Sequence, residues 1–163
     1  MREHTFHDID HVIDEVHDFF EAWVQGGTPS NALALDEYGF LVMKLAVHEW
    51  IANLVQFATF GDRPPMIRLV ISQHSSGLHC LIEDNSEGFD FQASIEEQTK
   101  ILNRPEPSER GRGLLMMLAC TEEFVYKTNG DGLQHLEFVV RPPVDSDDMP
   151  SFLPPSDQAF DKA

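Results

Sequence analysis

Apolar residues recur at helical intervals in two long segments near the start of the chain. The first runs from Asp8 to Gln25, before Gly26-Gly27, and carries the apolar residues Ile9, Val12, Ile13, Val16, Phe19, Phe20, Trp23 and Val24. The second runs from about Leu35 to Thr59, where Leu41, Leu45, Ala52 and Val55 fall near one stripe before Gly61. This spacing predicts two amphipathic helices.

Four later runs are rich in Ile, Val, Leu and Phe and are separated by turn residues. Residues 66–74 and 78–84 flank Ser75-Ser76-Gly77, which predicts an antiparallel hairpin. A second hairpin is predicted from residues 123–127 and 133–141, around the sequence Asn129-Gly130-Asp131-Gly132.

The segment between the two hairpins changes from polar to apolar. Residues 92–110 are polar and include Pro105 and Pro107, which predicts a helix followed by a loop, whereas Leu114 to Cys120 predicts a buried helix. The predicted order is helix, helix, two strands, helix with loop, helix, two strands. It predicts an α+β fold: a two-layer sandwich with a mainly antiparallel mixed sheet and helices on one face.

The size of the chain favours one domain. With 163 residues and 42% apolar composition, it can bury one ordinary core, which we assign to residues 1–141. Residues 142–163 are rich in Pro and Asp, which predicts a loosely ordered extension. The longest apolar run, Leu114 to Cys120, is too short to cross a bilayer, and the N-terminus lacks a secretory signal, so we expect no membrane association and a cytoplasmic location.

The charge of the chain disfavours nucleic acid as a partner. The formal net charge is −17, from 28 acidic and 11 basic residues, and such a surface repels polyanions and anionic membranes at long range. Arg104, Arg110 and Arg112 nevertheless gather in a short stretch. We interpret them as a local positive patch, or as loop arginines that pair with surface carboxylates.

Three motifs carry candidate chemistry. Glu49 and Asn53 are four residues apart, so on a helix both can reach one ligand, although a solvated Glu and a helix-surface Asn have the same spacing. Asp84 ends an apolar strand, where a ligand or an Asx turn would receive its carboxylate. Gly111 and Gly113 precede an apolar helix, whose N-terminal N–H groups can bind phosphate.

The order and spacing of Glu49/Asn53, Asp84-x-Ser86-x-Gly88 and Gly111-Arg112-Gly113-Leu114 resemble those of the Bergerat-fold (GHKL-type) ATPases. Within these, the chain is most similar to the small serine kinases that act as anti-sigma factors. The resemblance covers roughly residues 8 to 141.

This resemblance implies ATP and Mg²⁺ as cofactors and assigns roles to the motif residues. It implies that Asn53 holds Mg²⁺ against the phosphates, that Glu49 is the catalytic base, and that Asp84 accepts a hydrogen bond from the adenine amino group. The resemblance also implies the following nucleotide-binding residues: Ser86, Gly88, Arg110, Gly111, Arg112, Gly113 and Leu114.

The resemblance further implies protein partners. The expected substrate is a serine of an anti-anti-sigma (antagonist) protein, and the expected second partner is a sigma factor, so that the kinase regulates transcription. Such relatives are commonly homodimers, and the apolar N-terminal helix is a candidate interface.

Two other functions stay open. Ser86 stands where the family usually has glycine and Glu87 adds a negative charge, which favours a non-catalytic nucleotide- or partner-binding switch of the same fold. The third function is that of a nucleotide-hydrolysing regulatory domain.

Overall fold

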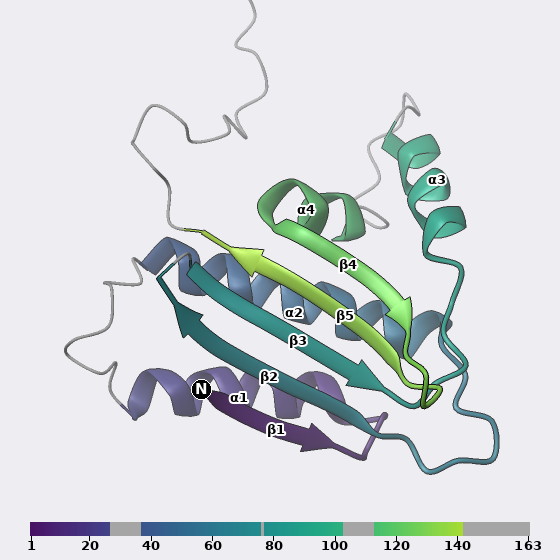
Figure 1. Cartoon of the computed structure of the whole chain (residues 1–163), viewed down its shortest axis with the longest axis horizontal. Helices are drawn as coiled ribbons and strands as arrows, with labels where there is room; N and C mark the ends of the chain where they lie inside the picture. The colour runs from purple at the N-terminus through teal and green to yellow at the C-terminus, as the bar shows by residue number, and fades with distance from the viewer. Residues whose placement is uncertain (27–36, 76, 103–112, 142–163) are drawn as a thin grey trace, which may run out of the picture.

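The structure of the chain is a computed structural model that describes residues 1–26, 37–75, 77–102 and 113–141, with the backbone alone at 37, 101 and 102. Figure 1 shows the arrangement of its helices and strands. In chain order they are β1 (Arg2–Phe6), α1 (Val12–Gln25), α2 (Glu37–Phe57), β2 (Ile67–His74), β3 (Gly77–Asp84), α3 (Phe91–Leu102), α4 (Gly113–Cys120), β4 (Glu122–Thr128) and β5 (Gln134–Val140).

The strands form one antiparallel sheet in the order β1-β2-β3-β5-β4. The β2–β3 hairpin closes between His74 and Gly77, so Ile67 pairs with Asp84 at its open end. Asp84 also pairs with Gln134 of β5, and Gln134 pairs with Thr128 of β4. The register therefore aligns three polar side chains in one row at the end of the sheet.

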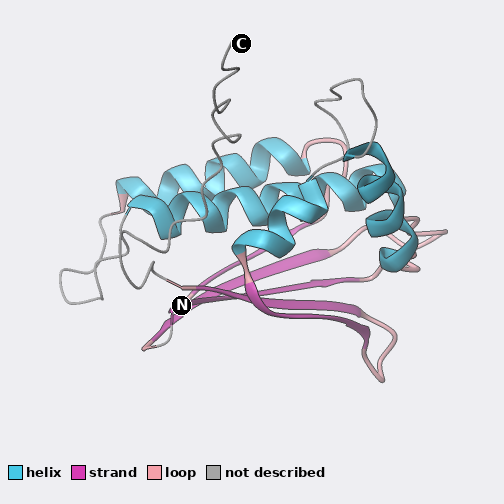
Figure 2. Cartoon of the chain, turned by 90° about the horizontal axis from the view of Figure 1, so that it is seen from above, coloured by secondary structure: helices cyan, strands magenta, loops and turns pink. Residues whose placement is uncertain are grey.

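Helices cover one face of this sheet. Figure 2 shows α1, α2 and α4 in a layer above the strands, with α3 at the end of that layer. The core between the two layers is formed by alternate strand residues and by one stripe of each long helix. Its fully buried members include Phe20, Met43, Val47, Trp50, Ile51, Leu54, Leu69, Ile71, Leu78, Ile82 and Phe138. Burying each of these side chains contributes about 1.5–3 kcal/mol before the entropy cost of folding.

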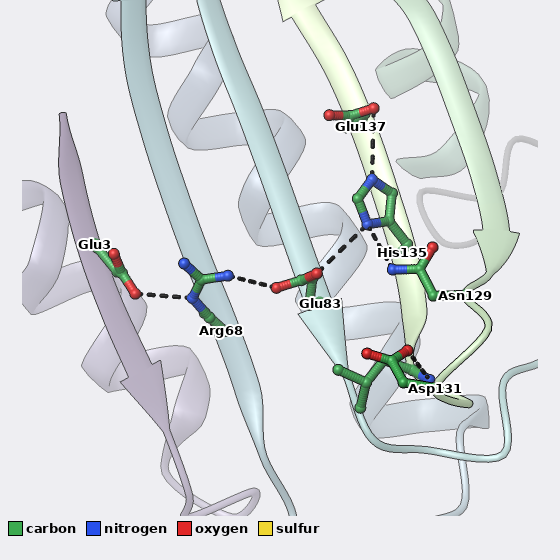
Figure 3. A network of polar contacts seen from close by, with 8 residues as sticks. Glu3, Arg68, Glu83, Asn129, Asp131, His135 and Glu137 are labelled. Carbon is green, nitrogen blue, oxygen red and sulfur yellow. Dashed lines mark hydrogen bonds and ion pairs between the residues drawn. The ribbon is translucent and has the colours of Figure 1, made fainter.

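The opposite face of the sheet carries a row of charged side chains, shown in Figure 3. Arg68 Nε lies 2.8 Å from Glu3 Oε1, and Arg68 Nη1 lies 2.6 Å from Glu83 Oε2. The hydrogen bond from Arg68 lowers the pKa of the Glu3 carboxyl. His135 continues the row between Glu83 and Glu137, at 3.6 and 3.4 Å. The strands therefore alternate between an apolar face that is buried under the helices and a face that carries these charged side chains together with the buried residues Val70 and Val139.

The predicted α+β sandwich with helices on one face is confirmed, and all strand pairs of the described sheet are antiparallel. Three details of the prediction were wrong. The first helix begins at Val12 rather than Asp8, and strand β1 before it was not predicted, because Phe6 is its only buried residue. On α2, Leu41 and Val55 face outward and are 62% and 43% exposed, since the buried stripe runs through Val47 and Trp50 instead.

Two other expectations concern the tail and membrane association. Residues 142–163 lie outside the described residues. Within the described ranges, none of the helices has the length and hydropathy that a membrane-spanning helix needs.

Cys80 and Cys120 are both free thiols, and Cys80 is buried.

Gly77 is the position of the hairpin where a side chain is excluded. Its φ is +139°, and an added Cβ would lie 2.4 Å from the backbone carbonyl oxygen of Val140. Gly77→Ala should therefore lower the free energy of unfolding by at least about 2 kcal/mol, measured by urea denaturation. Gly130→Ala is the matched control, because no atom lies within 4 Å of its Cβ position. Equal effects of the two substitutions would contradict the close approach.

Candidate functional site

Helix α2 presents Glu49 and Asn53 one turn apart. The Asn53 side chain is 7% exposed, and its Nδ2 donates a hydrogen bond of 2.5 Å to the backbone carbonyl of Glu49. Because this bond uses the amide nitrogen, Oδ1 is the atom left to accept a donor or bind a cation. The side chain of Glu49 is 28% exposed.

At the end of β3, Asp84 begins a chain of hydrogen bonds that shapes the following turn. Its carboxylate is 1% exposed, and Oδ1 accepts the Ser86 backbone N–H at 3.0 Å. The Ser86 hydroxyl then accepts the Gly88 N–H, also at 3.0 Å. Gly88 has a φ of +77°, and a Cβ there would lie 2.9 Å from Cδ of Gln134, so both its conformation and its space favour glycine.

Burial makes ionisation of the Asp84 carboxyl group unfavourable. Removal from water raises the pKa of its carboxyl above the ordinary value, and the hydrogen bond from Ser86 offsets only part of that rise. A buried carboxylate with one backbone donor has unused acceptor capacity. Such a group is a candidate acceptor for a hydrogen bond from a ligand.

The turn after Asp84 is anchored to the segment that follows α2. Asn85 Oδ1 accepts the Met66 N–H at 2.8 Å, and Asn85 Nδ2 donates to the Pro64 carbonyl at 2.9 Å. The Glu87 N–H donates to the Thr59 carbonyl at 2.8 Å. These bonds hold the turn beside the C-terminal end of α2.

Phe89 places the turn along the part of α2 that carries Asn53. Its ring centroid lies 5.3 Å from that of Trp50 and 6.5 Å from that of Phe57, the residues that flank Asn53 on the helix. Trp50 also contacts Tyr126 of β4, with the centroids 5.0 Å apart. Aromatic packing therefore joins α2, the turn and the sheet edge into one wall.

Two polar atoms within this aromatic wall lack hydrogen-bond partners. They are Trp50 Nε1 and Tyr126 Oη, both buried within the part of the chain that the structure describes. Burial raises the pKa of the Tyr126 hydroxyl, and the negative charge of Asp84 raises this pKa further. The nearby Phe89 backbone lowers the pKa and offsets part of the rise, without forming a hydrogen bond of normal geometry. Unpaired buried donors are uncommon in folded proteins and are consistent with a site that takes a polar ligand.

An open cavity of about 540 Å³ borders the turn. Gly88, Phe89, Tyr126, Thr128 and Gln134 are among its lining residues, whereas Asp84 is not. The Thr128 hydroxyl donates a hydrogen bond of 3.0 Å to Gln134 Oε1, so these two members of the polar row pair with each other. The cavity therefore lies beside the Gly88 turn, on a side that the Asp84 carboxylate does not line.

Helix α4 points its N-terminus at Glu49. A Cβ added to Gly113 would lie 1.7 Å from Glu49 Oε2, so a side chain there would displace the carboxylate from this position. The next residue, Leu114, donates its buried N–H to Oε1 of Gln98 at 3.1 Å. Two side-chain acceptors, one from α2 and one from α3, thus approach the first turn of α4, where N–H groups have no acceptor within the helix.

The sequence-predicted site residues fall into two groups. Those within the described residues gather around α2, the turn after β3 and the start of α4; they are Glu49, Asn53, Asp84, Ser86, Gly88, Gly113 and Leu114. Arg104, Arg110, Gly111 and Arg112 lie outside the described residues. The predicted positive patch therefore stays a prediction.

Sequence reasoning missed Gln98, Gln134 and Trp50. Gln98 interrupts the helical spacing of Phe91 and Ile95, and Gln134 interrupts the alternation of the buried face of β5, so each is a polar residue in an apolar pattern. That interruption is a usable signal, because a buried amide needs a partner. Trp50 gave no comparable signal, since a large apolar residue on α2 fits an ordinary core.

Comparison with protein families identifies the chain. The model of the histidine kinase-like ATPase domain matches residues 8–139, most of the chain, and the chain therefore belongs to this ATP-binding family. A comparison with curated proteins gave no match.

The residues present fit ATP and Mg²⁺. The unpaired donors and the buried Asp84 carboxylate suit a polar base, and the Asn53 amide oxygen is a hard oxygen ligand of the kind that Mg²⁺ prefers. The described residues contain no cluster of three or more His, Cys, Asp or Glu side chains for a metal. A Mg²⁺ ion here would depend on phosphate oxygens and water as well as on Asn53.

The buried carboxylate makes stability depend on pH. Because the pKa of Asp84 is higher in the folded than in the unfolded chain, its stabilising contribution is present below the unfolded pKa, about 3.9, and is lost as pH rises through the folded pKa. Asp84→Asn should therefore raise the melting temperature by a few degrees at pH 7, and this gain should vanish below about pH 4.

Thermal melts of the wild type and the variant across this pH range check the prediction. Asp18→Asn, at an exposed position of α1, is the control for the loss of one negative charge. A melting temperature lowered by Asp84→Asn at pH 7 would mean that the carboxylate has a stabilising partner and would refute the account.

Proposed function

We propose, from the membership of the chain in the histidine kinase-like ATPase family, that it is a serine protein kinase of the anti-sigma type. It would transfer the γ-phosphoryl group of ATP to a serine of an anti-anti-sigma protein and would also bind a sigma factor. The observation that carries the proposal is the meeting of the Glu49 carboxylate with the first residue of α4, Gly113. This contact joins a candidate base to a candidate phosphate site.

Each site residue has a part in the proposed reaction. Mg²⁺ supplies charge neutralisation on the phosphates when bound, and the Asn53 amide oxygen would hold it. Asp84 would accept a hydrogen bond from the adenine amino group. N–H groups at the start of α4 would bind phosphate oxygens, and Glu49 would accept the proton of the attacking serine hydroxyl.

The two departures from the family pattern are compatible with this function. Ser86 does not have a positive φ, and its hydroxyl accepts the Gly88 N–H, so its side chain stabilises the turn that a glycine would leave looser. Glu87 is exposed, and its Oε1 lies 3.4 Å from the Cβ position of Gly61. Water screens a charge at such a position, which weakens its repulsion of a nucleotide.

Binding of ATP by the site can be tested by calorimetry with and without Mg²⁺. We expect micromolar, Mg²⁺-dependent binding to the wild type. Asn53→Ala should remove the Mg²⁺ dependence, and Asp84→Asn should weaken binding at least about tenfold, because a hydrogen bond to a charged group contributes about 1.5–3 kcal/mol. Asp18→Asn on α1 should bind as the wild type does.

Three outcomes separate the candidate functions. ATP binding together with phosphorylation of a serine on an anti-anti-sigma protein supports the kinase. ATP binding without transfer to such a protein favours a non-catalytic switch, and steady phosphate release in the absence of any partner favours a hydrolysing regulatory domain. A wild type that binds no ATP in any buffer would contradict the nucleotide site itself.

A further inference from the structure

Gln98 is the one residue of α3 between positions 91 and 100 whose side chain is buried, with 7% exposed. Its Oε1 accepts the N–H of Leu114, the second residue of α4, at 3.1 Å. The surrounding α3 residues are exposed or half-buried. Phe91 and Ile95 also pack against the core from this helix, so the Gln98 hydrogen bond adds a polar attachment to an apolar one. A buried amide is stable in such a position only with a hydrogen-bond partner.

The Leu114 N–H belongs to the group of donors that a phosphate would use. The first four N–H groups of a helix have no intrahelical acceptor, and they bind anions readily because the helix dipole adds to their attraction. In the structure, Gln98 already occupies one of them, and the Glu49 carboxylate lies against Gly113 next to it. A phosphate oxygen that bonds to Leu114 must therefore replace Gln98.

We propose that Gln98 competes with a nucleotide phosphate for the Leu114 N–H, and that this competition couples occupancy of the site to the attachment of α3. The inference rests on the proposed ATP site. A charge-assisted hydrogen bond is stronger than a neutral one, so phosphate displaces the amide oxygen. The displaced amide must then leave its buried position for water, because an unpaired buried amide is costly.

This competition acts on the phosphates and not on the base. Adenosine has the same base and sugar as ATP but no phosphate, so its affinity should not depend on Gln98. The ratio of ATP affinity to adenosine affinity isolates the effect. A residue with a merely structural role would change both affinities together.

Calorimetric titrations of ATP with Mg²⁺ and of adenosine test the proposal in the wild type and two variants. Gln98→Met keeps the length of the side chain and removes the strong acceptor, so ATP should bind about threefold to tenfold more tightly, with adenosine unchanged. Gln98→Glu keeps the acceptor and adds a negative charge beside the phosphate site. This variant should bind ATP at least about tenfold more weakly, while its affinity for adenosine stays unchanged.

Gln92→Glu is the matched control, because it adds the same charge at an exposed position of α3. It should leave the ATP to adenosine ratio within about twofold of the wild type, since exposed charges are screened. An equal effect of Gln92→Glu would show a long-range charge effect and would overturn the competition. So would an unchanged ratio in both Gln98 variants, or ATP binding that Gln98→Met weakens.

The outcomes also separate this inference from the proposed function. A wild type that binds both ligands with a ratio independent of Gln98 removes the competition and leaves the nucleotide site intact. A wild-type protein that binds neither ATP nor adenosine would contradict both the competition and the nucleotide site. If Gln98→Met loosens the packing of α3, Gln98→Glu still decides, because it retains the acceptor for Leu114.

Discussion

The burial of one carboxylate, that of Asp84, organises the rest of the site. β3 carries it into the row of polar side chains at the end of the sheet, where it is 1% exposed. Its hydrogen bond with Ser86 starts the turn that leads to Gly88, and Asn85 and Phe89 fasten that turn to the segment after α2 and to α2 itself. Folding alone does not favour an ionised group in this position. A ligand that donates a hydrogen bond to this carboxylate would offset part of the free-energy cost of burying its charge.

The second constraint lies at the start of α4. The Glu49 carboxylate lies against Gly113, and Leu114 donates its N–H to Gln98 Oε1. A carboxylate, a helix N-terminus and an amide thus meet at two neighbouring residues of α4. In our account this meeting joins the proposed chemistry of α2 to α3, whose Phe91 and Ile95 also pack against the core.

Most of the fold and part of the site could be predicted from the sequence, because apolar periodicity and turn residues mark the elements except β1 and α3, and α3 was predicted from a polar segment. That edge strand buries only Phe6, so it shows no alternation, and its pairing with β2 defines it. The order and spacing of Glu49, Asp84 and Gly113 along the chain were enough to predict the motifs of the site. The partnership of Gln98 with Leu114 could not be predicted, since it depends on how α3 packs against α4.

The most direct test of the central claim is a competition between ATP and inosine triphosphate for the wild-type protein in the presence of Mg²⁺. Inosine triphosphate differs at the group that Asp84 is proposed to bind, because it presents a carbonyl oxygen where adenine presents an amino group. The account predicts that ATP binds at least about tenfold more tightly, since an acceptor would face a buried carboxylate. Equal affinities for the two nucleotides would contradict it.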